Sequence, residues 1–348
     1  MPEFDPALQW IHSVPATRKI LAGKVTLIYF WSFSNYESLN NLVFLNQLYA
    51  VYRPYGLVVI TIHVPHFEFE KSSDTISAFS ELFDLDFPIL LDNQGGMKAL
   101  YQAFRIPSFY LINAQGKIRK TFFDNYTHEA ISRSVSGLMR DNPKIILPTV
   151  TDAISKLSVT PSMFLEIPLG YQGLSHFGNL EKIRTQMDQK FAYPEYLEGD
   201  QFYLQGEWRF EADSLRALGK YSSLKIRTTF KTLSLMANRS ENQILKAVIT
   251  LNGVPLSNDV LGQDTFFDGT ETIAKISEPR HHHFLNLQDK PDHPQLWEIT
   301  FEGPADLYVI SLSDMPFQLT QKKLDVDKKA AAIARPDEKV RLKTTIQE

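Results

Sequence analysis

The stretch that most constrains the fold lies near the start of the chain, where three sequence patterns follow one another. Val25 to Phe30 is a continuous apolar run, which is typical of a strand buried on both faces. The residues from Trp31 to Ser38 mix aromatic and small polar side chains. Leu39 to Tyr49 then repeats apolar residues at spacings of three and four, which predicts a helix. This order places a polar turn at the start of a helix, directly after a buried strand.

Strand and helix patterns alternate over residues 1–140, which predicts crossover connections and a partly parallel sheet in an α/β domain. A five-residue connection with a glycine, 113–117, predicts a hairpin near its end. The expected strands cover 25–30, 57–63, 87–91, 108–112 and 118–122, and the expected helices cover 39–49, 75–82, 97–104 and 129–139.

The sequence pattern changes in the second half of the chain. Residues 141–169 contain several proline breakers around one short predicted helix at 152–157, and we interpret them as a linker. Short alternating strands with turns such as Asn252-Gly253 follow over 170–314 and predict an all-β sandwich of the jelly-roll kind. Residues 315–348, which are rich in charge and lack aromatic side chains from Gln321 onward, are expected to form a flexible tail.

Composition excludes several classes of function. The 348 residues are enough for two domains, and they include no cysteine, so the chain supplies no disulfide, thiolate ligand or thiol nucleophile. A formal net charge of -4 with scattered Lys and Arg argues against nucleic-acid binding. No apolar stretch is long enough to span a bilayer. We expect a soluble protein, cytoplasmic because no leader is seen, or extracytoplasmic if it is exported without a signal or if a leader is missing from this chain.

Four segments of the first domain carry a resemblance to a known family. They are Trp10 to Ser13, Gly23 to Val25, Phe30 to Ser34 and the long segment Val58 to Lys71. Together they resemble the thioredoxin-like domain of DipZ-type and TlpA-like proteins. The segments around Trp208, Asn252 and Trp297 resemble the carbohydrate-binding-module-like jelly roll that follows in DipZ-type proteins.

The resemblance places the family's two reactive cysteines on Asn35 and Ser38, and its buried acid on Tyr29. An amide and a hydroxyl cannot take part in thiol–disulfide exchange, because neither provides a thiolate or a sulfur leaving group. The resemblance also implies a cis peptide bond between Ile106 and Pro107, beside a groove that binds an extended peptide.

These observations predict a redox-inactive binding or adaptor protein rather than an enzyme, with no cofactor and with a protein or peptide partner. The groove at the degenerate active site is expected to recognise the partner, and the sandwich is expected to bind a protein or a sugar. The expected groove residues are Trp31, Phe33, Tyr36, Glu37, Ile106 and Pro107, and the aromatic residues that could stack on sugar rings are Tyr193, Tyr196, Tyr203 and Trp208.

Other interpretations stay open at this point. Ser38 is expected to cap the helix, but paired with His63 or His66 it would suggest a hydrolase. His281 and His283, on one face of an extended segment, would suggest a metal enzyme if His293 or Asp292 completed the site. The chain could also be an accessory protein of a thiol–disulfide pathway. In a last alternative the protein is purely structural and its own second domain fills the groove.

Overall fold

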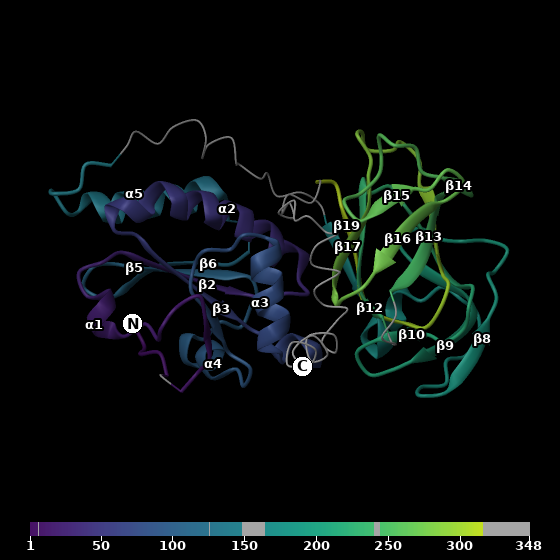
Figure 1. Ribbon diagram of the computed structural model, residues 1–348, viewed down its shortest axis with the longest axis horizontal. Helices are drawn as coiled ribbons and strands as arrows, with labels where there is room; N and C mark the ends of the chain where they lie inside the picture. The colour runs from purple at the N-terminus through teal and green to yellow at the C-terminus, as the bar shows by residue number, and fades with distance from the viewer. Residues whose placement is uncertain (6, 125, 148–163, 240–243, 316–348) are drawn as a thin grey trace, which may run out of the picture.

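A computed structural model describes residues 1–5, 7–124, 126–147, 164–239 and 244–315. They form two parts that lie side by side, an α/β part and an all-β part (Figure 1). The helix predicted at 152–157 and the charged tail beyond Met315 lie outside these residues. Among the described residues, no helix is long and apolar enough to cross a membrane.

The first part is a six-stranded sheet in the order β1-β4-β3-β2-β5-β6. The central strands β2, β3 and β4 are parallel, whereas β1, β5 and β6 are antiparallel to their neighbours. Every residue of β2 is buried, because helices cover both faces of the sheet. The strands are β1 (Trp10–Ile11), β2 (Thr26–Trp31), β3 (Val58–His63), β4 (Ile89–Leu91), β5 (Ser108–Ile112) and β6 (Ile118–Phe122).

Three helices cover one face of this sheet and two shorter ones cover the other. The first face packs α2 (Tyr36–Tyr52), α3 (Ser73–Leu82) and α5 (His128–Arg140) onto the sheet through one apolar cluster. The opposite face is covered by α1 (Arg18–Leu21) and α4 (Gly96–Tyr101). The elements predicted for this part are confirmed to within a few residues at their ends. The α/β, thioredoxin-like architecture is therefore present.

The second part is a 13-stranded antiparallel sheet that folds over into two layers around one apolar core, a nearly closed sandwich. Its path runs β15-β16-β13-β18-β11-β9-β10-β19-β12-β17, with β14, β7 and β8 paired to its sides. The strands are β7 (Phe164–Pro168), β8 (Asp188–Phe191), β9 (Phe202–Phe210), β10 (Leu215–Ala217), β11 (Ser222–Thr228), β12 (Thr232–Arg239), β13 (Leu245–Leu251), β14 (Val254–Pro255), β15 (Thr265–Phe267), β16 (Thr272–Ile276), β17 (Arg280–Asn286), β18 (Gln295–Phe301) and β19 (Ala305–Ser313).

Strand β9 joins the two layers. Its first half pairs with β11 and its second half pairs with β8 and β10. Gly206 lies at the change of partner with φ +95°, and a Cβ there would approach the Cα of Ser222 to 2.9 Å. Only glycine fits both the backbone conformation and the space.

Strand β7 is a difference from the sequence prediction, which assigned its residues to the linker. It pairs antiparallel with β19 and places Ile167 in the sandwich core. The short run Leu165-Glu166-Ile167 does alternate apolar and polar residues, but the neighbouring Pro161 and Pro168 favoured assigning it to a loop. This strand proves to be central to the contact between the two parts.

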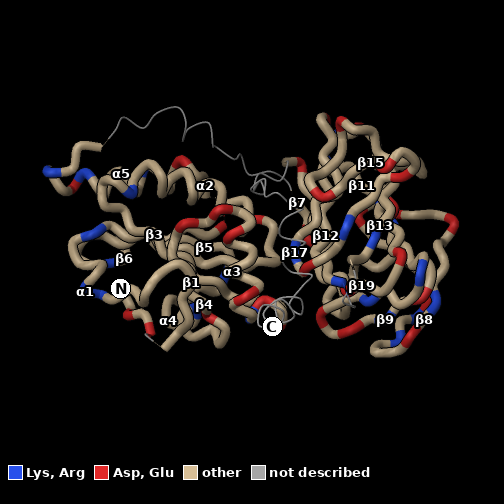
Figure 2. Tube along the Cα trace, in the orientation of Figure 1, with Lys and Arg blue, Asp and Glu red and all other residues tan. Residues whose placement is uncertain are grey.

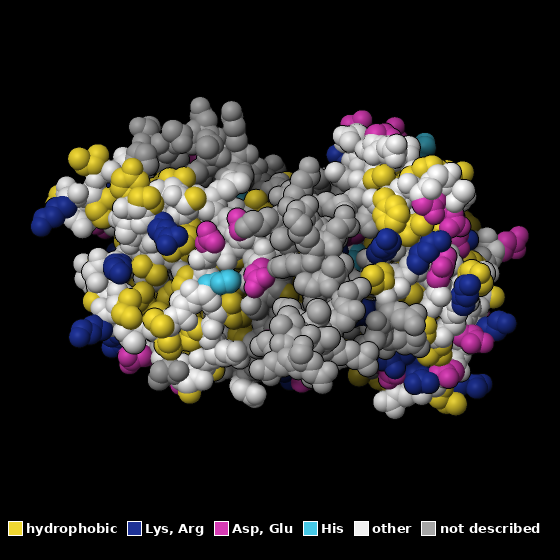
Figure 3. Space-filling model, viewed as in Figure 1, with side chains coloured by type: hydrophobic (Ala, Val, Ile, Leu, Met, Phe, Trp, Pro, Cys, Tyr) yellow, Lys and Arg dark blue, Asp and Glu magenta, His cyan; other side chains and the backbone are white. Residues whose placement is uncertain are grey.

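Charged side chains are interspersed over both parts (Figure 2), and hydrophobic side chains lie on both parts of the face shown in Figure 3. Scattered exposed apolar residues of this kind are normal for a folded surface and do not by themselves mark a binding site.

Asp92 provides a test of how the first part is held together. Its buried carboxylate accepts hydrogen bonds from the backbone nitrogens of Met97 (3.0 Å) and Lys98 (2.7 Å) at the start of α4. We expect Asp92→Ala to lower the free energy of unfolding by about 2 kcal/mol, because one buried and one partly buried backbone donor lose their acceptor. Urea denaturation measures this loss. The exposed Asp86 is the control, and an equal loss in Asp86→Ala would show that the hydrogen bonds of Asp92 contribute nothing.

Candidate functional site

The candidate site is the turn from Ser32 to Asn35 together with the first turn of α2, which we call the α2 centre. Asn35 is the N-cap of α2, and its side-chain oxygen accepts a hydrogen bond from the Ser38 backbone nitrogen at 2.8 Å. This differs from the prediction that the Ser38 hydroxyl caps the helix. An asparagine that precedes the helix can reach the free backbone N–H groups of the first turn, whereas Ser38 already lies inside the helix.

The Ser38 side chain instead has a structural role. Its Oγ is buried and accepts a hydrogen bond from the Ser32 backbone nitrogen at 3.3 Å. The Tyr29 hydroxyl donates to the Ser38 carbonyl oxygen at 2.9 Å. Burial raises the pKa of Tyr29 well above its usual value, so this phenol is a neutral donor and not a base.

A carboxylate from the second part occupies the start of α2. Glu166 of β7 accepts hydrogen bonds from the backbone nitrogen of Tyr36 (2.7 Å) and from Nδ2 of Asn35 (2.8 Å). The N-terminus of a long helix carries partial positive charge and free N–H groups, both of which favour an acceptor with two oxygens. Burial nevertheless raises the pKa of Glu166 to about 7, against the opposing effect of these hydrogen bonds.

Further contacts surround this carboxylate. The outward side chains of β7, β12, β17 and β19 form what we call the docking face. His281 donates from Nε2 to the Ser34 carbonyl oxygen at 2.6 Å, and Tyr308 packs against Phe67 and Phe69 with ring centroids 4.9 and 4.8 Å apart. The docking face consists of Glu166, Met236, His281, His283, Tyr308 and Val309.

The docking face closes the α2 centre. Tyr36 is only 2% exposed, its ring lies 6.3 Å from that of His281, and its hydroxyl donates to the Met315 carbonyl oxygen at 3.3 Å. Met236 and Val309 belong to the same apolar cluster as α2. The groups at the start of α2 are therefore covered by the protein's own second part.

A buried polar network lies beneath the centre. Glu70 is fully buried and accepts a hydrogen bond from the Ser32 hydroxyl at 2.9 Å, while Nε2 of His63 lies 3.3 Å from the same carboxylate. Burial alone would raise the pKa of Glu70, but the hydrogen bond and charge of His63 outweigh it and lower that pKa. Among the hydrogen bonds of the described residues, none joins His63 or His66 to Ser38, so the geometry of a serine hydrolase is not assembled here.

The residues predicted to line the groove differ in their surroundings. The Ile106–Pro107 peptide bond is cis, as predicted. Trp31 and Phe33, however, are core residues that pack on Phe79 with ring centroids 5.9 and 4.7 Å away. They are directed into the apolar core beneath the centre and cannot line an open groove. Glu37 is half-buried at the outer side of α2, where its carboxylate accepts a hydrogen bond from the Tyr126 hydroxyl at 3.3 Å.

The predicted sugar-stacking residues are not gathered into one surface. Tyr203 and Trp208 are buried in the sandwich, so their assignment as sugar platforms is wrong. Strand alternation indicates which residues share a face but not which layer covers that face. Tyr193 is half-buried with Lys225 4.1 Å above its ring, and Tyr196 alone of the four is well exposed.

The three histidines proposed as weak metal ligands have different surroundings. His281 and His283 do share one strand face, with ring centroids 6.4 Å apart, but that face is the docking face. His293 is exposed on a loop. Within the described ranges, no three His, Cys, Asp or Glu side chains are arranged to hold a metal ion.

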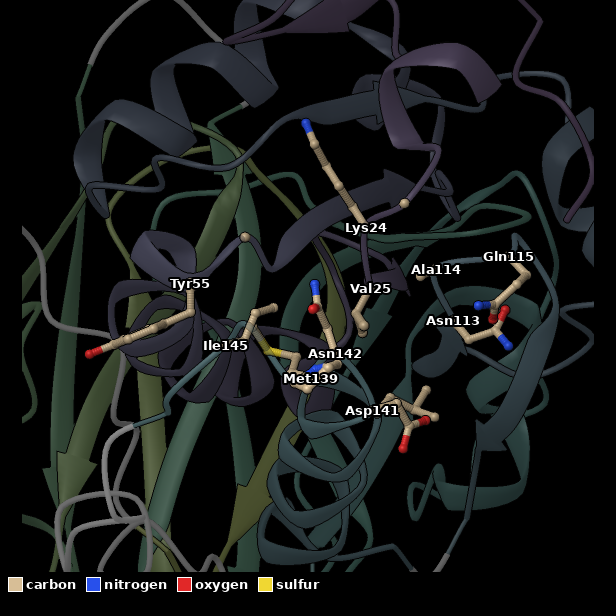
Figure 4. A pocket seen from close by; sticks show the side chains of 14 residues that line it. Lys24, Val25, Tyr55, Asn113, Ala114, Gln115, Met139, Asp141, Asn142 and Ile145 are labelled. Atoms are coloured by element: carbon tan, nitrogen blue, oxygen red, sulfur yellow. The ribbon is translucent and has the colours of Figure 1, made fainter.

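A cavity of about 360 Å³ lies at the other end of β2 from the α2 centre (Figure 4). It is formed by the residues before β2, the β5–β6 hairpin and the end of α5. Lys24, Tyr55, Asn113, Gln115 and Asp141 are among the side chains that line it. The cavity is separate from every site residue predicted from the sequence.

Two family models match the chain, one over each part. Residues 8–121 match the AhpC/TSA family, and residues 165–309 match the thioredoxin-like C-terminal domain. The protein DipZ of Mycobacterium bovis is 24% identical over 279 residues, which cover 76% of this chain and 39% of DipZ. The thiol-disulfide oxidoreductase ResA of Geobacillus thermodenitrificans is 27% identical over 118 residues, which cover 33% of this chain and 64% of ResA.

The chain thus spans about two fifths of the length of DipZ and somewhat less than two thirds of that of ResA. Among solved structures, that of the thioredoxin-like superfamily protein SPOA0173 is 22% identical with a TM-score of 0.37, covering 42% of this chain and 97% of that one. The matches to sequence relatives confirm the predicted resemblance for both parts of the chain.

Glu166 should give the folded protein a pH dependence that Glu166→Gln removes. The pKa of Glu166 is about 7 in the folded protein, whereas an unfolded glutamate titrates near 4.3. Between these values the folded state keeps a proton that the unfolded state has released. The resulting stabilisation is complete below about pH 4 and is lost as the pH rises through 7. We expect the advantage of wild type over Glu166→Gln to shrink by up to about 3 kcal/mol between pH 4.5 and 8.

Urea denaturation of both proteins across this pH range measures the difference. Glu166→Gln also loses one hydrogen bond, but that loss is the same at every pH and leaves the slope interpretable. Glu195→Gln, at an exposed position of the sandwich, is the matched control. Parallel pH profiles for wild type and Glu166→Gln would mean that Glu166 ionises as freely in the folded protein as in the unfolded chain.

Proposed function

We propose that this chain, a thioredoxin-like protein of the DipZ type that contains no cysteine, is a redox-inactive binding protein whose α2 centre recognises a carboxylate. The observation that carries the proposal is the pair of hydrogen bonds from Tyr36 and Asn35 to Glu166. Where the resemblance places a reactive cysteine, this chain has Asn35, whose side-chain amide donates a hydrogen bond to Glu166. Its chemistry is hydrogen bonding, which forms and breaks no covalent bond.

The surroundings of the centre support recognition over catalysis. A nucleophile needs an adjacent base and access to its substrate. The Ser38 hydroxyl is fully buried and already accepts a hydrogen bond from the Ser32 backbone. The buried phenol of Tyr29 stays protonated because burial raises its pKa. Neither group can deliver or remove a proton at a bound substrate.

In the closed arrangement the ligand of the centre is the protein's own sandwich. This favours the alternative in which the second part fills the groove, and it gives the adaptor role a specific form. The two parts act as one unit, joined by Glu166, His281 and the packing of Tyr308. A protein partner then binds either the outer surface of this unit or, when the docking face has moved away, the α2 centre.

Restoring the cysteines provides a test. In Asn35→Cys/Ser38→Cys, both new thiols would lie beneath the docking face, since Ser38 is fully buried and Asn35 is half-buried. We expect the reduced double variant to react with a chromogenic disulfide reagent at least about tenfold more slowly than an exposed thiol, because reactivity requires access as well as thiolate. Ser13→Cys, at an exposed position of the same part, is the reference.

The same double variant should also fail to accelerate the reduction of insulin by dithiothreitol above the wild-type background. Denaturant should restore full thiol reactivity, which separates coverage by the fold from chemical damage. Rapid reaction in the native state, or clear catalysis of insulin reduction, would show that the centre is open and still suited to redox chemistry, against the proposal.

A further inference from the structure

The hydrogen bonds of the α2 centre select one kind of ligand group. The Asn35 side-chain oxygen is occupied by the Ser38 backbone nitrogen, which fixes the orientation of the amide and turns Nδ2 toward Glu166. The second donor is the Tyr36 backbone nitrogen. Two donors held side by side match the two oxygens of a carboxylate. A side-chain amide would place its own NH₂ group against one of them, so the centre distinguishes an ionised acid from an amide.

Neighbouring side chains of the strand that delivers the carboxylate point to opposite sides. In β7, Glu166 points to the α2 centre while Ile167 is buried in the sandwich core. The centre therefore binds an acidic side chain on an extended segment, and the neighbouring apolar residues pack in the sandwich. Any extended segment that presents an acidic side chain in this way could make the same hydrogen bonds.

The closed contact also carries costs that opening would relieve. Nδ1 of His281 is buried at the interface and has no hydrogen-bond partner among the described residues. A buried polar atom left without a partner costs about 1–3 kcal/mol. The Glu166 carboxylate is itself held where burial disfavours its charge. The contact between the docking face and the α2 centre is consequently less stable than a continuous apolar core would be.

We infer that the docking face is an intramolecular competitor, and that the α2 centre binds an extended partner segment carrying an acidic side chain when the sandwich moves away. This rests on the proposed function, since it names the ligand class of the same centre. A tethered competitor acts at an effective concentration on the order of mM, so a free segment with the same contacts binds the closed chain weakly. Weakening the docking face should expose the centre.

The test uses the full chain and two labelled peptides. One peptide has the sequence of residues 162–170 with a lysine tail for solubility, and the other has glutamine in place of its glutamate. The opened variant is Glu166→Ala/Tyr308→Ala, which removes the in-cis carboxylate and the packing on Phe67 and Phe69. Glu195→Ala/Tyr196→Ala removes the same residue types from an exposed site and is the matched control.

Small-angle scattering reports whether the variant opens, and fluorescence anisotropy reports binding. We expect the opened variant to bind the acidic peptide at least about tenfold more tightly than wild type or the control variant. Its affinity for the glutamine peptide should be at least about tenfold lower, and adding Asn35→Ala should weaken acidic-peptide binding by a similar factor.

Three results would overturn the inference: an opened variant that does not distinguish the two peptides, a variant that stays as compact as wild type, or wild type that binds as tightly as the variant. The proposed function fails separately. If Asn35→Cys/Ser38→Cys reacts rapidly in the native state or catalyses insulin reduction, the centre is open and the proposed function fails. If that variant stays unreactive but the peptides do not bind the opened variant, the carboxylate site serves only its own chain.

Discussion

The arrangement of the two parts depends on one interaction, the seating of a carboxylate at the N-terminus of α2. Glu166 reaches the Tyr36 backbone nitrogen and the Asn35 amide from a strand about 130 residues further along the chain. A buried helix end must have its free N–H groups satisfied, and a buried carboxylate must have donors. The first part therefore supplies the hydrogen-bond donors and the second part supplies the acceptor. The aromatic packing of Tyr308 and the hydrogen bond of His281 lie around this pair, which is half-buried.

The replacements at the centre form a consistent set around that interaction. Where the resembling family has two thiols and an acid, this chain has an amide, a hydroxyl and a phenol, all neutral near pH 7. Each makes a defined hydrogen bond: Asn35 to Ser38 and Glu166, Ser38 to Ser32, and Tyr29 to the Ser38 carbonyl. A neutral, fully bonded centre can be covered by another domain at modest cost, whereas a thiolate with its base could not.

Much of the fold could be predicted from sequence because its signals are local. The buried strands β2, β3 and β5 are predominantly apolar, and the position of the α2 centre follows from the turn after β2. What could not be predicted is which surfaces meet. Alternation along β12 and β17 does not reveal that Met236 and His281 face another domain, so the histidines suggested metal ligands. Glu166 was missed because its five-residue strand follows Pro161 and ends in Pro168, both of which are loop signals.

The choice of groups at the contact also sets the pH range in which it is most stable. Burial lowers the pKa of His281 to about 4, below its unfolded value near 6.5, so its contribution is present above pH 6.5 and is lost as the pH falls toward 4. Glu166 has the opposite sign, since its raised pKa makes its contribution fade as the pH rises through 7. His281 donates to a carbonyl oxygen rather than to Glu166, so the two do not form an ion pair. Burial therefore disfavours the charged form of both groups, while the hydrogen bonds from Tyr36 and Asn35 favour the charged form of Glu166, and its raised pKa is the balance of these two effects.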